Sequence, residues 1–125
     1  QLSGAAGNLA TDIEMAKTQA IRENATVVIA FQSNSYKLFL DTGDGGVGPP
    51  NWNQDAGERL VLQRELPPGV RIDTSSLSFP TVSDKTRFNS RGIPYDIVTP
   101  ETISVKQGGQ NRLITINRLG NVEVQ

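Results

Sequence analysis

Four acidic side chains stand in and beside a glycine-rich stretch, DTGDGGVGPP at residues 41–50, and carboxylates in such a loop are typical of calcium sites. These side chains are Asp41, Asp44, Asp55 and Glu58. An EF-hand loop needs oxygen ligands at its first, third and fifth positions, yet the later positions are glycines whether the count starts at Asp41 or at Asp44. The four carboxylates could still converge on a cation through folding of the loop. We keep them as candidate metal ligands, while turn formation is the favoured interpretation.

Two other kinds of chemistry fit this stretch less well. A phosphate-binding loop ends in Gly-Lys-Ser/Thr and opens a helix, but here two prolines follow. Asp41 with Asp55, or Glu58 with Glu65, could be proposed as an acid–base pair, although nothing in the sequence places either pair in one cleft. Chance pairings are expected among 13 acidic residues. We therefore predict a surface connection, with no catalytic residue and no cofactor.

Composition excludes several functional classes. The 125 residues contain no cysteine and no histidine, which removes the usual zinc sites, thiol nucleophiles and histidine general bases. A net charge of -1 and a pI near 5.4 give no global basic field for nucleic acid. The longest apolar run, VVIAF, is far shorter than the roughly 18 residues of a membrane span. The chain starts without Met, and we expect it to be part of a longer protein.

The elements that must position these residues begin with a helix over about residues 1–24. Its apolar positions recur at spacings of three and four and form one stripe. They are Leu2, Ala6, Leu9, Ile13, Ala16 and Ala20. Asn24 is the predicted stop, because asparagine tolerates the left-handed conformation that closes helices.

From residue 26 onward the period becomes that of strands, separated by turns rich in glycine and proline. The expected strands lie near 26–31, 35–41, 58–66, 70–73, 86–94 (a short strand leading into a glycine turn), 102–107, 112–118 and 121–124, with a weaker one near 76–80. In the third of these, Leu60, Leu62 and Arg64 alternate and are expected on one face. A helix followed by about eight short strands predicts a single α+β domain, with the helix laid on antiparallel sheets.

Arginines in the C-terminal half offer an alternative function. Arg87, Arg91, Arg112 and Arg118 lie in or beside strands and turns, where arginines can bind phosphates. Basic runs are absent, however, and acidic residues are interspersed. Solvated arginines at strand edges are the favoured interpretation, and a surface module binding DNA or another ligand remains the alternative.

Four segments, taken in order, resemble the GspH/FimT-type minor pseudopilins and minor pilins. They are LATDIEMAKTQAIRENATVVIAF (9–31), FLDTGDGGVGPPNWNQDAGERLVLQRELPPGVRI (39–72), RFNSRGIP (87–94) and RLITINRLGNVEV (112–124). Lys17 stands where the family typically has arginine. Some pilus relatives bind DNA through basic residues in the last hairpin, but here Asn121 and Glu123 hold those positions, which argues against DNA uptake.

The resemblance implies a filament subunit made with a leader that is cleaved and then N-methylated. Such a protein is anchored in the bacterial inner membrane by a long apolar helix, of which this chain would hold the second half. Its globular domain would lie in the periplasm or at a pilus or pseudopilus tip. Its partners would be other minor and major subunits and, for some members, secreted proteins.

Within that role we assign expected contacts to particular residues. Leu2, Ala6 and Leu9 are expected to pack against helices of neighbouring subunits, whereas Ile13, Ala16, Ala20 and Ile21 are expected to pack on the domain's own sheet. The glycine-rich loop is the expected partner surface. Its residues are Asp44, Gly45, Gly46, Pro49, Pro50 and Trp52. The sequence does not separate a secretion pseudopilus from a type IV pilus.

Overall fold

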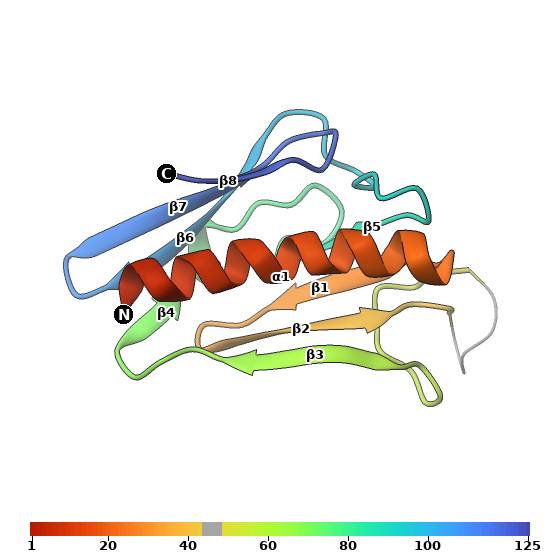
Figure 1. The fold of residues 1–125 in the computed structure, drawn as a ribbon, viewed down its shortest axis with the longest axis horizontal. Helices are drawn as coiled ribbons and strands as arrows, with labels where there is room; N and C mark the ends of the chain where they lie inside the picture. Colours follow the sequence, from red (N-terminus) through yellow and green to blue (C-terminus); the bar gives the residue numbers. More distant parts are fainter. Residues whose placement is uncertain (44–48) are drawn as a thin grey trace.

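One long helix lies across two antiparallel sheets in the computed structural model, which describes residues 1–43 and 49–125 (Figure 1). The helix is α1 (Leu2–Glu23), and the strands are β1 (Val27–Phe31), β2 (Ser35–Leu40), β3 (Leu60–Glu65), β4 (Val70–Ile72), β5 (Lys85–Phe88), β6 (Glu101–Gln107), β7 (Gln110–Ile116) and β8 (Val122–Val124). The first sheet has the order β3-β2-β1-β5 and the second β4-β6-β7-β8. The predicted α+β architecture with about eight strands is confirmed.

Helix α1 ends where the sequence predicts. Asn24 adopts the left-handed conformation, with φ 51°, and its backbone N–H donates to the carbonyl groups of Ala20 and Ile21. Four of the eight buried residues of α1 are alanines, whose small side chains let the helix pack closely on the sheets. No helix in the described part of the chain is both long and apolar enough to cross a membrane.

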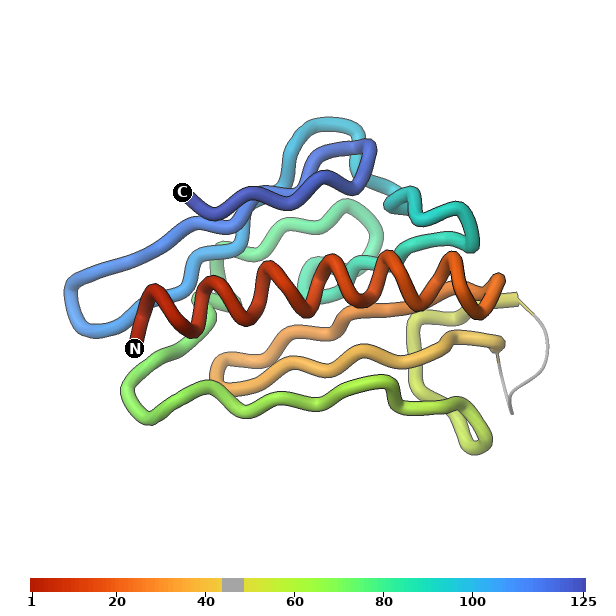
Figure 2. The backbone as a smooth tube through the Cα atoms, in the orientation of Figure 1, coloured from red at the N-terminus to blue at the C-terminus, as the bar shows by residue number. Residues whose placement is uncertain are grey.

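The core is shared by the helix and both sheets. Helix α1 contacts β1 and β5 of the first sheet and β6, β7 and β8 of the second, and the tube in Figure 2 shows the two sheets diverging on either side of it. From the sheets, fully buried Ile29 and Leu38 meet the helix on one side and Ile103 and Ile114 on the other. Burial of one helical stripe against two sheet faces supplies the main driving force for this fold.

The segment 76–80 is not the strand that alternation predicts. A 3-10 turn (Thr74–Ser76) is followed by extended backbone that pairs with no strand. Leu77 and Phe79 are nevertheless buried, and the Phe79 ring stacks on Phe31 with centroids 5.7 Å apart. The alternating apolar residues therefore anchor a loop in the core. The predicted strand at 76–80 was wrong because a side chain can be buried without its backbone pairing with another strand.

Strand β3 also departs from simple alternation. Leu38 pairs with Leu62, but the next residue of β2, Phe39, pairs with Leu60, so Val61 is an extra residue in a β-bulge. The bulge turns Val61 toward the core and leaves Leu60 42% exposed. The expectation that Leu60 shares a face with Leu62 and Arg64 is corrected accordingly.

Candidate functional site

The carboxylate of Asp41, directly after β2, is buried and turned toward backbone amides rather than toward solvent. One oxygen, Oδ1, accepts the backbone N–H groups of Gly43 at 3.2 Å and Asn51 at 3.1 Å. The other, Oδ2, accepts the backbone N–H of Trp52 at 2.6 Å. Charge-assisted bonds to backbone N–H groups are among the stronger protein hydrogen bonds. Asp41 therefore holds the two ends of the glycine-rich loop together.

Glu58 closes the same loop from its other end. Its Oε2 accepts the backbone N–H of Thr42, and its Oε1 accepts the backbone N–H of Asp55 at 2.6 Å. The Asp55 carboxylate in turn accepts the side-chain amide of Asn51 at 2.7 Å. In residues 1–43 and 49–125 no three acidic side chains gather closely enough to hold a metal ion. The fourth candidate ligand, Asp44, lies outside the described residues.

The proposed acid–base pairs find no shared cleft. Glu58 precedes β3 and Glu65 ends it, so the length of a strand separates the two carboxylates. Asp41 and Asp55 both face hydrogen-bond donors of their own loop, as described above. These four groups serve loop closure and strand ends, and they do not form a catalytic arrangement.

Trp52 fixes the loop onto the outer face of the first sheet. Its backbone takes a positive φ of 72°, and its carbonyl group accepts the ammonium of Lys85 at 3.0 Å. The indole ring packs on a small apolar cluster on that face of the sheet. The cluster consists of Val28, Ala30 and Phe39. A tryptophan with φ above zero is uncommon, and here Asp41 and Lys85 hold the backbone on both sides of it.

A cation lies between two aromatic rings beside this cluster. The Arg87 guanidinium carbon is 4.2 Å from the Trp52 ring centroid and 3.9 Å from that of Tyr95. The two rings meet edge to face at 5.9 Å. Such contacts stabilise a charge that is largely removed from water. The stack therefore makes Arg87 a structural residue of the outer face.

The four arginines considered for nucleic acid do not form one surface. Arg87 is buried in the aromatic stack. Arg112 donates to the carbonyl of Gln125 at 3.0 Å and to the Ser3 hydroxyl at 3.1 Å. Arg91 and Arg118 are exposed. Only two members of the set thus have free access to solvent, which weakens the DNA alternative.

Sequence reasoning missed a buried ionic group that joins α1 to the first sheet. The carboxylate of Asp12 accepts the Tyr36 hydroxyl at 2.5 Å and the Arg64 Nε at 2.6 Å. Burial, reinforced by the neighbouring Asp12 carboxylate, raises the pKa of Tyr36 well above its usual value. The hydrogen bond to Asp12 likewise raises the pKa of Arg64. A signal was present, because Asp12 lies three residues after Leu9 and therefore on the apolar stripe.

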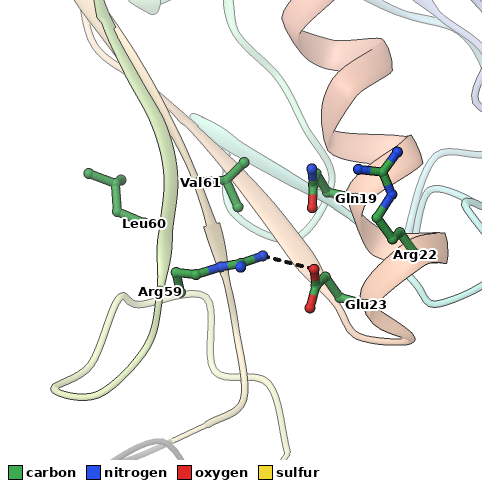
Figure 3. Close-up of a pocket in the computed structure, with 6 residues that line it drawn as sticks. All are labelled: Gln19, Arg22, Glu23, Arg59, Leu60 and Val61. Carbon is green, nitrogen blue, oxygen red and sulfur yellow. Dashed lines mark ion pairs between the residues drawn. The ribbon is translucent and has the colours of Figure 1, made fainter.

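An open groove lies between the end of α1 and β3 (Figure 3). Its volume is about 340 Å³, and its lining residues are Gln19, Arg22, Glu23, Arg59, Leu60 and Val61. The Arg59 guanidinium and the Glu23 carboxylate pair across it at 3.1 Å. The one carboxylate of its lining, that of Glu23, is held in this ion pair, and the other lining side chains are amide, guanidinium and apolar groups that suit contacts with another molecule.

The fold and the family comparison agree. The model of the family described as Type II transport protein GspH matches residues 5–120. This chain belongs to the GspH family. Family members are structural subunits of pseudopili and pili and not enzymes, and they have periplasmic, membrane-anchored or pilus-associated locations.

Solved structures show the same fold at low sequence identity. The type IV minor pilin FimU of Pseudomonas aeruginosa has a TM-score of 0.70 at 14% identity, over 99% of this chain and 92% of that one. The minor pseudopilin EpsH of the type 2 secretion system of Vibrio cholerae has a TM-score of 0.68 at 16% identity, over 99% and 95% of the two chains. No curated protein matches the chain by sequence.

For a GspH-family subunit, the helix contacts expected from sequence need revision. Leu2, Ala6 and Leu9 are buried in the domain's own core, so they have no surface to offer a neighbouring helix. Ile21, expected under the sheet, is 52% exposed, and its side chain lies over Gly92 instead. The exposed side of α1, which includes Asn8, is the one left for a neighbour.

The expected partner loop of this GspH-family chain is only partly described. Asp44, Gly45 and Gly46 lie outside the described residues. Pro49 is exposed and Pro50 is half-buried. The Trp52 ring packs on the first sheet, so this residue supports the loop and does not project from it.

Proposed function

We propose that this GspH-family subunit primes or caps the assembly of a type II secretion pseudopilus or a type IV pilus. The match over residues 5–120 carries the proposal, because it spans the helix and both sheets. The coarser role, participation in pseudopilus or pilus assembly through other subunits, follows from the family itself. Priming and capping are the specific activities that fit a minor subunit.

The proposal includes an anchor and a domain boundary. Residues 1–125 form a single pilin-like globular domain, with 1–24 as the second half of a longer helix whose first half inserts into the inner membrane. Secreted proteins are further proposed partners. The loop between β2 and β3 stays a predicted partner surface, supported by the two buried carboxylates, Asp41 and Glu58, that hold its base in one conformation.

The test is deletion of the gene in its native host, followed by counting filaments in cells that overproduce the major subunit. A priming subunit sets how many filaments start, so we expect fewer filaments of ordinary length, restored by a plasmid copy. Secretion of exoproteins and surface piliation, measured in the same strains, distinguish the two kinds of filament. Normal filament number and normal secretion in the deletion strain would refute the proposal.

A surface module for DNA or another ligand is the second candidate. It rests on Arg91 and Arg118, both exposed, whereas Arg87 and Arg112 are engaged within the domain. Gel-shift titration at low salt tests it, with Arg91→Ala and Arg118→Ala as the variants. An unshifted DNA band with the wild-type domain removes this candidate.

A further inference from the structure

Exposed apolar side chains gather where the end of α1 meets two loops of the chain. Ile21 is on the helix, Ile93 and Val98 are in the segment after β5, and Leu119 is in the turn between β7 and β8. Val98 is 77% exposed and Leu119 is 58% exposed. With Pro100 these residues form what we call the turn patch. Exposed apolar groups that adjoin one another, as Val98, Pro100 and Leu119 do around one hollow, are typical of surfaces that another molecule covers.

The three segments of the turn patch touch one another directly. A Cβ on Gly92, whose φ is +79°, would lie 2.7 Å from Ile21 Cδ1, so the helix side chain rests on this turn. A Cβ on Gly120, with φ +85°, would lie 3.0 Å from the Gly92 carbonyl oxygen. Both positions need glycine for conformation and for space. These close approaches bring the helix end and both turns together on one side of the molecule.

A hollow on the turn patch is open and mainly apolar. Its volume is about 240 Å³, and it is lined by Val98, Pro100, Asn117, Arg118 and Leu119. One side chain of leucine or phenylalanine size from another molecule would fill part of it. Burial of such an anchor is the usual source of affinity at the centre of a protein interface.

Three cations flank this apolar centre on the side of Gly92 and Arg118, while the Glu123 carboxylate lines an adjoining hollow that shares Pro100 and Asn117 with it. Arg91 and Arg118 are exposed, and the stem of Lys17 lies against Gly92. None of the three forms an ion pair with any residue in 1–43 or 49–125. Their charges are thus available to a partner, and the complementary surface would carry carboxylates around an apolar side chain.

We propose that the turn patch docks a different subunit of the filament, through a surface with an apolar anchor and an acidic rim. This inference rests on the proposed function. The charges favour a different subunit over a second copy of this chain. If two copies met patch to patch, the three cations of one copy would face those of the other, and this repulsion opposes self-association. DNA would neutralise the cations but would bury Val98 and Leu119 without an apolar partner.

The experiment titrates this 125-residue domain, by calorimetry, with the purified periplasmic domain of each other pilin-like subunit encoded in its gene cluster. We expect one of them to bind. Leu119→Glu should weaken that binding about tenfold or more, because it places a charge in the apolar hollow. Arg118→Glu should weaken it and remove most of the salt dependence measured between about 50 mM and about 500 mM NaCl. Val124→Glu, at an exposed apolar position on β8 outside the turn patch, is the control and should bind as the wild type.

Four other outcomes would overturn the docking proposal or assign the turn patch to another partner. Binding that survives Leu119→Glu and Arg118→Glu places the subunit contact elsewhere and leaves the proposed function intact. No binding by any domain at about 1 mM overturns the docking proposal, and the filament count in the deletion strain then decides the proposed function separately. Sedimentation tests self-association: if the wild type forms a dimer and Leu119→Glu dissociates it, the turn patch is a contact between two copies.

A gel shift tests DNA: if the wild type shifts DNA, Arg118→Glu does not, and no subunit binds, the turn patch is a nucleic-acid surface. Circular dichroism and melting of each variant confirm that it is folded.

Discussion

Two buried carboxylates, Asp12 and Asp41, both need hydrogen-bond donors away from water, and they find them in different parts of the chain. Asp12 is 2% exposed and meets the side chains of Tyr36 and Arg64, which are 24 and 52 residues away along the chain. Asp41 is 1% exposed and meets backbone N–H groups between 2 and 11 residues away. One carboxylate joins the helix to a distant strand, and the other organises its own loop.

Because their partners differ, the loss of each carboxylate should affect a different extent of the structure. Arg64 lies on the edge strand β3, so its pair with Asp12 ties that strand to α1 across the core. Asp41 is surrounded by amide dipoles of a loop whose opening would leave the sheets paired. We therefore expect damage at Asp12 to affect global unfolding and damage at Asp41 to remain local.

The largest expected effect is that of Asp12→Ala. It leaves the Tyr36 hydroxyl without its acceptor in the core and Arg64 without its counter-ion, and should cost about 2–3 kcal/mol of unfolding free energy. The Arg64 side chain is partly exposed and can regain water, which keeps the cost below that of a fully buried pair. Urea denaturation measures it. Glu14→Ala, on the exposed side of the same helix, is the control, and an equal effect of the two changes would refute the comparison.

Asp41→Ala should cost less globally, about 1–2 kcal/mol, because its three amide donors can turn to water when the loop loosens. The local effect should be larger. Trp52 is the single tryptophan of the sequence, so its fluorescence should shift to the red under native conditions as its ring leaves the sheet. Asp12→Ala should leave the native spectrum unchanged. A red shift in Asp12→Ala and none in Asp41→Ala would show that Asp12, and not Asp41, holds Trp52 in place, which contradicts the comparison.

The pH dependence that Tyr36 contributes to stability should appear in alkali. Burial first, and then the Asp12 carboxylate, raise the pKa of the Tyr36 phenol in the folded state. The folded protein then holds this proton above pH about 10, where the unfolded chain releases it, so stability is complete below pH 10 and falls as pH rises further. Absorbance of the phenolate in a Tyr95→Phe background reports Tyr36 alone. Ionisation near pH 10 in the folded protein would contradict the expected burial.

The smallest effect concerns an acidic side chain outside both sites, Asp73. A hydrogen bond from the Ser75 hydroxyl, and then the Lys106 ammonium, lower the pKa of Asp73 to about 2. A lowered pKa stabilises the folded state above the unfolded value near 4, and this contribution is lost as pH falls toward 2. Carboxyl carbon shifts in NMR measure it. Ser75→Ala should raise this pKa more than Lys106→Ala, and the reverse order would reassign the main cause.

Local patterns predicted much of this fold. The spacing of Leu9, Ile13, Ala16 and Ala20 indicates the helix, and Asn24 ends it as expected. Alternation located the strands from β1 to β8 within a few residues. It failed at 76–80, where Leu77 and Phe79 anchor a loop, and at the Val61 bulge. At 76–80 the pattern records burial, which does not specify hydrogen-bond partners, and in β3 one extra residue shifts Leu60 out of the alternation.

The candidate site was less accessible to sequence reasoning. The carboxylates of DTGDGGVGPP drew attention because they stand among glycines, and the structure shows Asp41 and Glu58 closing a loop. The sequence did not identify Asp12 as a buried group, although it lies on the apolar stripe, because its partner Arg64 is on another element. The turn patch could not be foreseen either, since it depends on Gly92 and Gly120 bringing separate turns against the helix.

Periodicity and composition act over a few residues at a time, and they were enough to predict the order of the elements, most of their buried faces and the absence of histidine and cysteine chemistry. Which buried carboxylate meets a charged side chain, which meets amides, and which apolar residues stay on the surface became clear only from the packed structure. Those outcomes depend on contacts between residues far apart in the chain, and their geometry exists only once α1 has packed on both sheets.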